Sequence, residues 1–214
     1  MNFRTVYVVA LCFLGTSASA ATIQVEDIFS NAGFEDGNLN GWTATKPNSN
    51  YIFPTGGNPI INPVIDPSGP TPQLTAPAGN NFVGVLNPGD IAPDENVKLV
   101  HDAVAGSFDA GDVIEGTFWA NRGRLNGFTV PSTGTATVKL YGWAAGSLPM
   151  VNPDDSWTRS PLFTLTFQYD FTGQLDGEWG SKLFDFILPF DASYLSIAIV
   201  GQNHNHDQYV ALPG

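Results

Sequence analysis

Aromatic and polar side chains gather in two segments in the middle of the sequence, and a third segment adds one polar residue. The aromatic members are Trp119, Tyr141 and Trp143, and the polar members are Lys139, Arg122 and Gln168. Flat aromatic rings stack on the apolar faces of sugar rings, while the polar groups hydrogen-bond to sugar hydroxyls. If the segments are neighbouring strands with these side chains facing outward, the sequence predicts one exposed platform. The alternative is that the proline-rich stretch 54–79 or a terminal segment covers this face and the rings belong to the core, because large exposed apolar patches are rare.

Two further tryptophans lie in turn-rich segments. Trp157 follows Asp154-Asp155-Ser156, and Trp179 lies between two glycine-containing turns. We expect each to be a loop anchor packed back on a sheet, with a second aromatic edge as the less favoured interpretation.

The chain offers few residues for metal-dependent chemistry. His204 and His206 alternate, so both imidazoles would point to one side of a strand. Zinc would need a third ligand, for which His101 is the remaining histidine. A polar loop is the favoured interpretation of the 203–207 segment.

Catalytic signatures are also sparse. The sequence contains no nucleophile elbow, phosphate-binding loop or dinucleotide fingerprint. Two carboxylate pairs, Asp154 with Asp155 and Glu115 with Asp170, could serve a glycosidase if their carboxyls lie about 5–10 Å apart. We predict no catalytic residues and leave enzyme activity uncertain.

The elements that would position these residues are β-strands. Period-two alternation predicts strands at 112–120, 136–144, 162–171, 184–188 and 195–199, and weaker patterns predict 22–29, 51–53, 81–86, 97–104 and 208–212. The alternation directs Ile114, Phe118 and Leu140 inward. About ten strands with one apolar face each indicate an all-β, two-sheet antiparallel jelly-roll β-sandwich.

The stretch 54–79 differs from its surroundings. It holds prolines at positions 54, 59, 63, 67, 70, 72 and 77 and a single charge, Asp66. Proline cannot donate a ladder hydrogen bond, so we predict a long surface loop in place of a central strand.

The first twenty residues have the pattern of a signal peptide. Arg4 precedes a short apolar run that ends in Ala18-Ser19-Ala20, an Ala-x-Ala cleavage pattern. The run is too short to span a bilayer, and no other segment reaches about 18 apolar residues. We therefore expect residues 21–214 to form one secreted domain, extracellular or at the cell surface, without an integral membrane segment. Cys12 lies in the signal, which leaves the mature chain without disulfides.

The chain is acidic. Its formal net charge is −12. Loss of the signal with Arg4 would leave seven basic and twenty acidic residues, because the signal contains no acid. This balance argues against nucleic acid and anionic lipid as partners.

The segment Asn31-Ala-Gly-Phe-Glu-Asp-Gly-Asn-Leu-Asn-Gly-Trp42 resembles the opening of galactose-binding-like β-sandwich domains, including jelly-roll carbohydrate-binding modules. The resemblance extends to Asn81–Leu86 and to a closing strand at 207–212. It implies the sandwich fold, with Phe34 and Trp42 pinning the first strand to the core. As an indication of function it is weaker, because this architecture serves sugar binders, adhesins and enzyme accessory domains.

The resemblance also implies a structural calcium ion. In such domains a carboxylate at the position of Glu35 joins an aspartate of the last strand, here Asp207, with backbone carbonyls. Asn31 is a weaker candidate for the same site, and Asp36 another. The alternative is that Glu35 accepts hydrogen bonds from turn amides.

Together these features predict a secreted, non-catalytic domain that binds a glycan or polysaccharide of the cell surface or extracellular matrix, with a structural calcium ion. The first alternative is a structural or adhesive surface protein that binds another protein. The second is a jelly-roll glycosidase or polysaccharide lyase.

Overall fold

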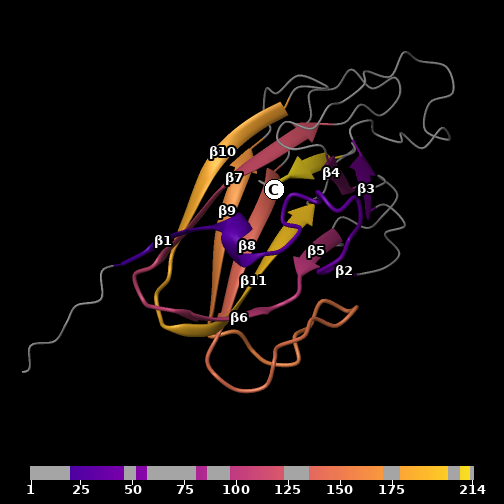
Figure 1. Ribbon diagram of the computed structural model, residues 1–214. Coiled ribbons are helices and arrows are strands. Elements are labelled where there is room, and N and C mark those ends of the chain that lie inside the picture. Colours follow the sequence, from indigo (N-terminus) through magenta and orange to yellow (C-terminus); the bar gives the residue numbers. More distant parts are fainter. Residues whose placement is uncertain are drawn as a thin grey trace, which may run out of the picture.

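The computed structural model describes residues 20–45, 52–56, 81–85, 97–122, 135–170, 179–201 and 208–212. Its elements are β1 (Thr22–Gln24), α1 (Val25–Ile28), β2 (Trp42–Thr45), β3 (Ile52–Gly56), β4 (Asn81–Val85), β5 (Val97–His101), β6 (Val104–Phe108), β7 (Val113–Arg122), β8 (Thr135–Trp143), β9 (Phe163–Asp170), β10 (Trp179–Ile187), β11 (Ala192–Gly201) and β12 (Gln208–Ala211) (Figure 1).

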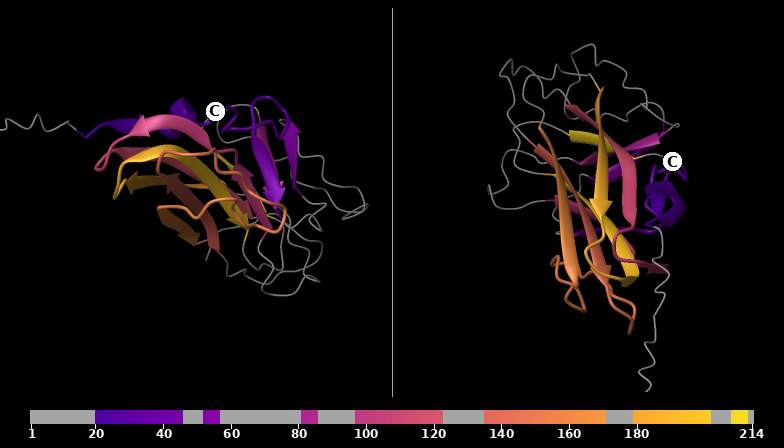
Figure 2. Two further views of the ribbon diagram at one scale, coloured as in Figure 1. Left: turned by 90° about the horizontal axis from the view of Figure 1, so that it is seen from below. Right: turned by 90° about the vertical axis from the view of Figure 1, so that its left-hand side faces the viewer.

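The strands form two six-stranded sheets packed as layers (Figure 2). Sheet A has the order β1-β7-β12-β4-β3, with β10 on the other side of β7. Sheet B has the order β2-β5-β11-β8-β9, and β6 also pairs with β11. Every pairing is antiparallel except that of β1 with β7. The predicted all-β sandwich is confirmed.

The core lies between the sheets and follows the predicted alternation. Ile114 and Phe118 of β7 and Leu140 of β8 are fully buried. Other members of this core are Val138, Phe163, Phe184, Phe186, Leu188, Leu195, Ile197 and Ile199. Because alternate side chains leave a strand on opposite faces, one register places each whole apolar set inside.

The N-terminal motif is anchored as predicted. Phe34 is fully buried and its ring centroid lies 5.1 Å from that of Trp42. The Trp42 indole Nε1 donates a 3.0 Å hydrogen bond to the Asn31 carbonyl. Gly37 and Gly41 adopt left-handed φ angles of 68° and 81°, which glycine tolerates without steric cost.

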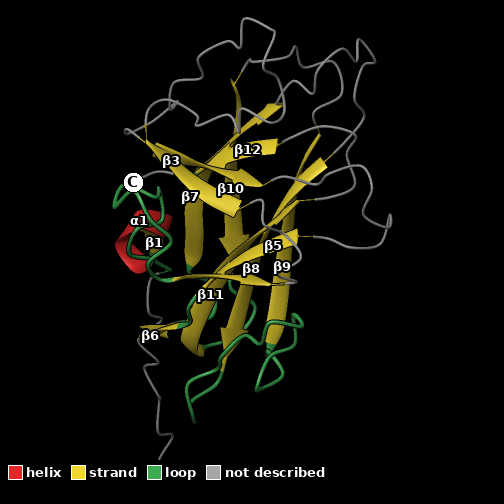
Figure 3. Cartoon of the chain, turned by 90° about the vertical axis from the view of Figure 1, so that its right-hand side faces the viewer, coloured by secondary structure: helices red, strands yellow, loops and turns green. Residues whose placement is uncertain are grey.

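Three features of the predicted strand pattern are wrong. The expected strand 22–29 ends at Gln24, where pairing with β7 stops, and continues as the short helix α1, which buries Val25 in the core (Figure 3). The expected strand 97–104 is two strands, because β5 and β6 pair with different parts of β11. Strand β2 was not predicted.

Strand β3 extends three residues into the predicted proline-rich loop. Pro54, Thr55 and Gly56 belong to β3, which pairs with β4 at the edge of sheet A. An edge strand tolerates proline because one side needs no ladder hydrogen bonds. The remainder of the predicted loop, 57–79, lies outside the described residues.

Candidate functional site

Four of the six predicted ligand residues share the outer face of sheet B. Lys139, Tyr141 and Trp143 alternate along β8, and Gln168 of β9 belongs to the same face because it pairs with Thr137. Trp119 lies on β7 in sheet A. The prediction of one continuous platform is therefore wrong, because the two segments belong to different sheets. Arg122 is also in β7, and its side chain lies outside the described part.

The expectation that Tyr141 and Trp143 are exposed is also wrong. Their exposed fractions are 7% and 1%, and their rings stack with centroids 6.0 Å apart. Trp157 covers them, with its centroid 5.3 Å from Tyr141 and 4.6 Å from Trp143. Trp157 is half-buried, so part of its indole meets solvent. The prediction that Trp157 is a loop anchor is confirmed.

The covering segment is 144–162, the connection between β8 and β9, which is the orange loop at the bottom of Figure 1. Its Arg159 guanidinium donates to the carbonyls of Ser147 at 2.6 Å, Ala144 at 3.2 Å and Ala145 at 3.3 Å. The Trp143 indole Nε1 donates to the Arg159 carbonyl at 3.2 Å. Because these bonds join both ends of the connection, they hold its fold over the sheet.

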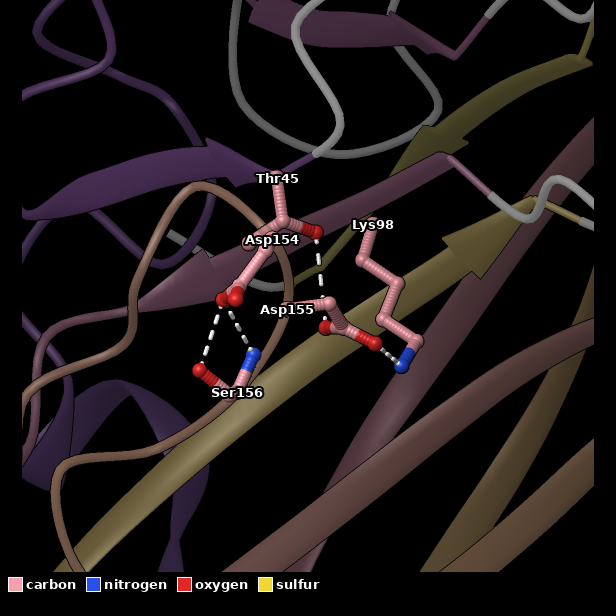
Figure 4. Close-up of polar contacts among 5 residues, drawn as sticks. All are labelled: Thr45, Lys98, Asp154, Asp155 and Ser156. Atoms are coloured by element: carbon pink, nitrogen blue, oxygen red, sulfur yellow. Dashed lines mark hydrogen bonds and ion pairs between the residues drawn. The ribbon is translucent and has the colours of Figure 1, made fainter.

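A carboxylate of this connection reaches the polar part of the face (Figure 4). Asp155 forms an ion pair with Lys98 of β5, and its Oδ1 accepts a 3.4 Å hydrogen bond from the hydroxyl of Thr45 on β2. The exposed fractions of the Lys98 and Asp155 side chains are 15% and 20%. Asp155 has a left-handed φ of 75°, a conformation that aspartate tolerates better than most residues.

The neighbouring Asp154 has a local role. Its Oδ1 accepts hydrogen bonds from the Ser156 backbone N–H at 3.0 Å and the Ser156 hydroxyl at 2.6 Å. These bonds lower the pKa of Asp154 because they favour the charged carboxylate. Asp154 and Asp155 therefore engage different partners, Ser156 in one case and Lys98 with Thr45 in the other (Figure 4). The other carboxylate pair considered for a glycosidase is separated, because Glu115 lies in sheet A and Asp170 in sheet B.

Two polar groups of β8 lack a hydrogen-bond partner within the described part of the chain. Thr137 Oγ1 is buried and unpaired. Lys139 is half-buried, and burial lowers the pKa of its ammonium, with repulsion from Lys98 adding to the effect and attraction to Asp155 opposing it. Burial and the negative charge of Asp155 raise the pKa of Tyr141 to about 12. The charges of Lys98 and Asp155 thus act on the Lys139 ammonium, and the charge of Asp155 also acts on the Tyr141 phenol.

Strand β9 continues this face as an exposed strip. Thr164, Thr166 and Gln168 are exposed and pair with Tyr141, Lys139 and Thr137 respectively. Same-face side chains recur about every 6.6 Å along a strand, and neighbouring strands lie about 4.8 Å apart. Hydroxyl, amide and ammonium groups therefore form a flat array of donors and acceptors.

Sequence reasoning identified Lys139 and Gln168 as members of this face but missed Lys98, Thr137 and Thr166. Thr166 could have been found, because it alternates with apolar residues as an outward position should.

The residues predicted to bind metal are placed differently. The Asn31 side-chain amide forms three hydrogen bonds within its own loop, each at 3.1 Å. Its Nδ2 donates to the carbonyls of Asn38 and Asn40, and its Oδ1 accepts from the Asp36 N–H. These hydrogen bonds hold the Asn31 side chain within the loop. Glu35 is half-buried beside this loop, while Asp207 lies outside the described residues. Within the described ranges, no three His, Cys, Asp or Glu side chains form a metal-binding group.

His101 does not fit a zinc site. It is buried, and its Nδ1 and Nε2 lie 2.7 Å from the Asp102 carbonyl and 2.8 Å from the Ser30 carbonyl. Both ring nitrogens are thus engaged by backbone. His204 and His206, the other candidates, lie outside the described residues.

No family model matches this chain, and no curated protein matches it. Solved structures do match. A cyclase from Fischerella sp. TAU aligns with a TM-score of 0.50 at 14% identity, covering 87% of this chain and 96% of that one. A family 16 carbohydrate-binding module aligns with a TM-score of 0.46 at 15% identity, covering 86% and 95%.

A third match is the enzymatically active domain of tailspike protein 4 of bacteriophage CBA120. Its TM-score is 0.49 at 11% identity, and this chain spans 21% of its length. The sandwich fold that the N-terminal motif indicates is present in the two sheets. Carbohydrate-binding modules of several families are among the matched structures. Among the described residues, no helix has the length and apolar character needed to cross a membrane.

Proposed function

We propose that this protein is a secreted, non-catalytic domain that binds glycans through the outer face of sheet B. One observation carries the proposal: Lys139, Thr166 and Gln168 lie side by side on adjacent strands, and Thr166 and Gln168 are exposed. A sugar presents hydroxyls that both donate and accept hydrogen bonds, so an array of ammonium, hydroxyl and amide groups complements it.

Trp157 supplies the aromatic part of the proposed face. Its half-buried indole rests on Tyr141 and Trp143, so the ring is held rigidly by packing. A ring immobilised before binding loses little conformational entropy when a sugar stacks on it. In this proposal Tyr141 and Trp143 support the binding face from below.

A glycan array with the protein lacking residues 1–20 tests the proposal. We expect binding to at least one polysaccharide, and a Thr166→Ala/Gln168→Ala variant should bind that polysaccharide about tenfold more weakly through loss of two hydrogen bonds. Trp119→Ala is the control, because Trp119 lies on the other sheet. Absence of glycan binding would overturn the proposal. Binding that is lost with Trp119→Ala and retained by the double variant would move the site to sheet A.

One observation favours the second candidate function, that of an adhesive or structural protein. On the outer face of sheet A, the exposed fractions of Leu183 and Ile187 are 80% and 61%. They pair with Thr117 and Val113, and Ser181 pairs with the half-buried Trp119. If a second copy of this chain covers this face, sedimentation should show a dimer that Leu183→Lys dissociates. A monomer at all concentrations would rule out a second copy of this chain as the partner of this face.

Secretion and the calcium ion remain parts of the proposal. Secretion is supported by the charged start, apolar run and Ala18-Ser19-Ala20 pattern. N-terminal sequencing of protein recovered outside the cell should begin at Ala21. The calcium ion would be held by Glu35, Asp207 and backbone carbonyls, with Asn31 as a weaker candidate ligand.

A further inference from the structure

The outer face of sheet B carries two lysines in an acidic protein, together with the carboxylates of Asp155 and Asp170. Lys98 and Lys139 are two of the four lysines, in a chain with a formal net charge of −12. Lys98 lies on β5 and Lys139 on β8, and β11 separates them with Val200 and Ala198 at the paired positions. Both side chains leave the sheet on the same face, because Val200 and Ala198 are two residues apart on β11.

The two lysines have different partners. Lys98 is paired with Asp155, whereas within the described residues Lys139 has neither a hydrogen-bond partner nor an ion pair. Lys139 is half-buried, and repulsion from Lys98 adds to the cost of its charge. A partly desolvated ammonium without an acceptor is destabilising. An anionic group of a ligand would supply the missing acceptor.

A second unsatisfied group lies beside Lys139. Thr137 is two residues away on the same face of β8, is 1% exposed, and its hydroxyl is unpaired within the described chain. A buried donor without a partner is destabilising, because it has lost its hydrogen bonds to water. The two adjacent groups can together serve one acceptor-rich ligand group, if neighbouring side chains shift to admit it.

Asp155 shows that this face accommodates a carboxylate. Its carboxylate lies between the Lys98 ammonium and the Thr45 hydroxyl (Figure 4). It comes from the covering connection and not from the sheet, and its backbone is in the left-handed conformation. Asp155 is thus a carboxylate from the same chain, bound to one of the two lysines.

We infer that the glycan recognised here is a polyuronate, whose carboxylate binds Lys139 while Asp155 competes for Lys98. The inference rests on the proposed glycan-binding function and names its ligand class. Neutralising Asp155 should free Lys98 and strengthen binding, whereas removing the Lys139 ammonium should weaken it. The two substitutions therefore act in opposite directions.

Isothermal titration calorimetry against a panel of polyuronates, each beside its methyl ester, tests the inference. The ester retains the sugar backbone and loses the charge. We expect the wild type to prefer at least one polyuronate, with a preference that declines at high salt. Lys139→Met should lower the affinity about fivefold, and Asp155→Asn should raise it by a similar factor.

Matched controls separate local from global charge effects. Lys182→Met and Asp185→Asn make the same charge changes on β10, in sheet A. Neither should change the preference. Equal affinity for acid and ester, or equal effects of Lys139→Met and Lys182→Met, would overturn the inference. Binding to neutral glycans alone would overturn it while leaving the proposed function intact, whereas failure to bind any glycan would overturn both.

Discussion

Trp157 lies against Trp143 with ring centroids 4.6 Å apart and planes inclined at 59°. This contact joins the β8–β9 connection to the outer face of sheet B. It buries Tyr141 and Trp143, which were predicted to be exposed, in a second hydrophobic core. That core consists of Val100, Tyr141, Trp143 and Ala198, with Trp157 packed against it. The accessible part of the face consequently consists of the strip along β9, the partly exposed Lys98 and Lys139 and the exposed part of Trp157.

Trp157→Ala should destabilise the protein by about 2–3 kcal/mol, because it removes the ring that covers Tyr141 and Trp143 and leaves apolar surface exposed. Urea unfolding followed by circular dichroism measures the change. Leu183→Ala is the control and should change stability by less than about 0.5 kcal/mol, since Leu183 is 80% exposed. Equal effects of the two substitutions would contradict the packing role of Trp157.

Lys139→Met should stabilise the protein at neutral pH by up to about 1 kcal/mol, despite weakening the proposed ligand binding. Burial and the charge of Lys98 lower the pKa of Lys139, so the folded state disfavours the charged form that predominates at neutral pH. This cost disappears as the pH rises towards the ordinary lysine pKa of 10.5. The stability difference between wild type and variant should therefore shrink in alkaline solution, and a wild type that is more stable at neutral pH would contradict the prediction.

The phenol of Tyr141 should make stability fall in alkaline solution. Its pKa is raised from 10.0 to about 12, so its contribution is constant below pH 10 and is lost as the unfolded chain ionises between pH 10 and about 12. Each unit of pKa difference corresponds to about 1.4 kcal/mol. Tyr141→Phe should reduce the slope of stability against pH in this window. Parallel curves for wild type and variant would show that the phenol ionises equally in both states.

Gly142→Ala should destabilise the protein by about 1–3 kcal/mol, because the added methyl group would overlap the Phe163 ring. Phe163 pairs with Gly142 across β8 and β9 and lies over it. Phe163→Leu in the Gly142→Ala background provides the matched test. The double variant should be more stable than the sum of the two single effects predicts, and strict additivity in thermal unfolding would argue against the overlap.

Chelation of calcium should lower the melting temperature of the wild type and leave that of Asp207→Asn unchanged. The predicted ion would connect the N-terminal motif at Glu35 with the last strand, and a ligand that binds the folded state alone stabilises it. Differential scanning calorimetry with and without EGTA measures both values. Asn31→Ala serves as a contrast, since it should lower the melting temperature through loss of loop hydrogen bonds while retaining sensitivity to EGTA. An EGTA-insensitive wild type would remove the calcium site.

By itself, the sequence determined which side chains of each strand fill the interior. Ile114, Phe118, Leu140 and Ile197 are buried as their alternation requires, because the two-residue period is a local property of an extended chain. The anchoring of Phe34 and Trp42 was equally predictable, since glycines permit the turns between large apolar residues. The sequence also indicated Lys139 and Gln168 as members of one polar face.

Tertiary structure decided which strands are neighbours and what covers them. Alternation cannot show that Trp119 belongs to a different sheet from Tyr141 and Trp143, because strand pairing depends on contacts between residues far apart in the chain. It also cannot show that segment 144–162 folds back to place Trp157 on Trp143 and Asp155 beside Lys98. Whether an outward-facing side chain meets solvent is set by such non-local contacts, and the accessible binding face is therefore a property of the folded chain.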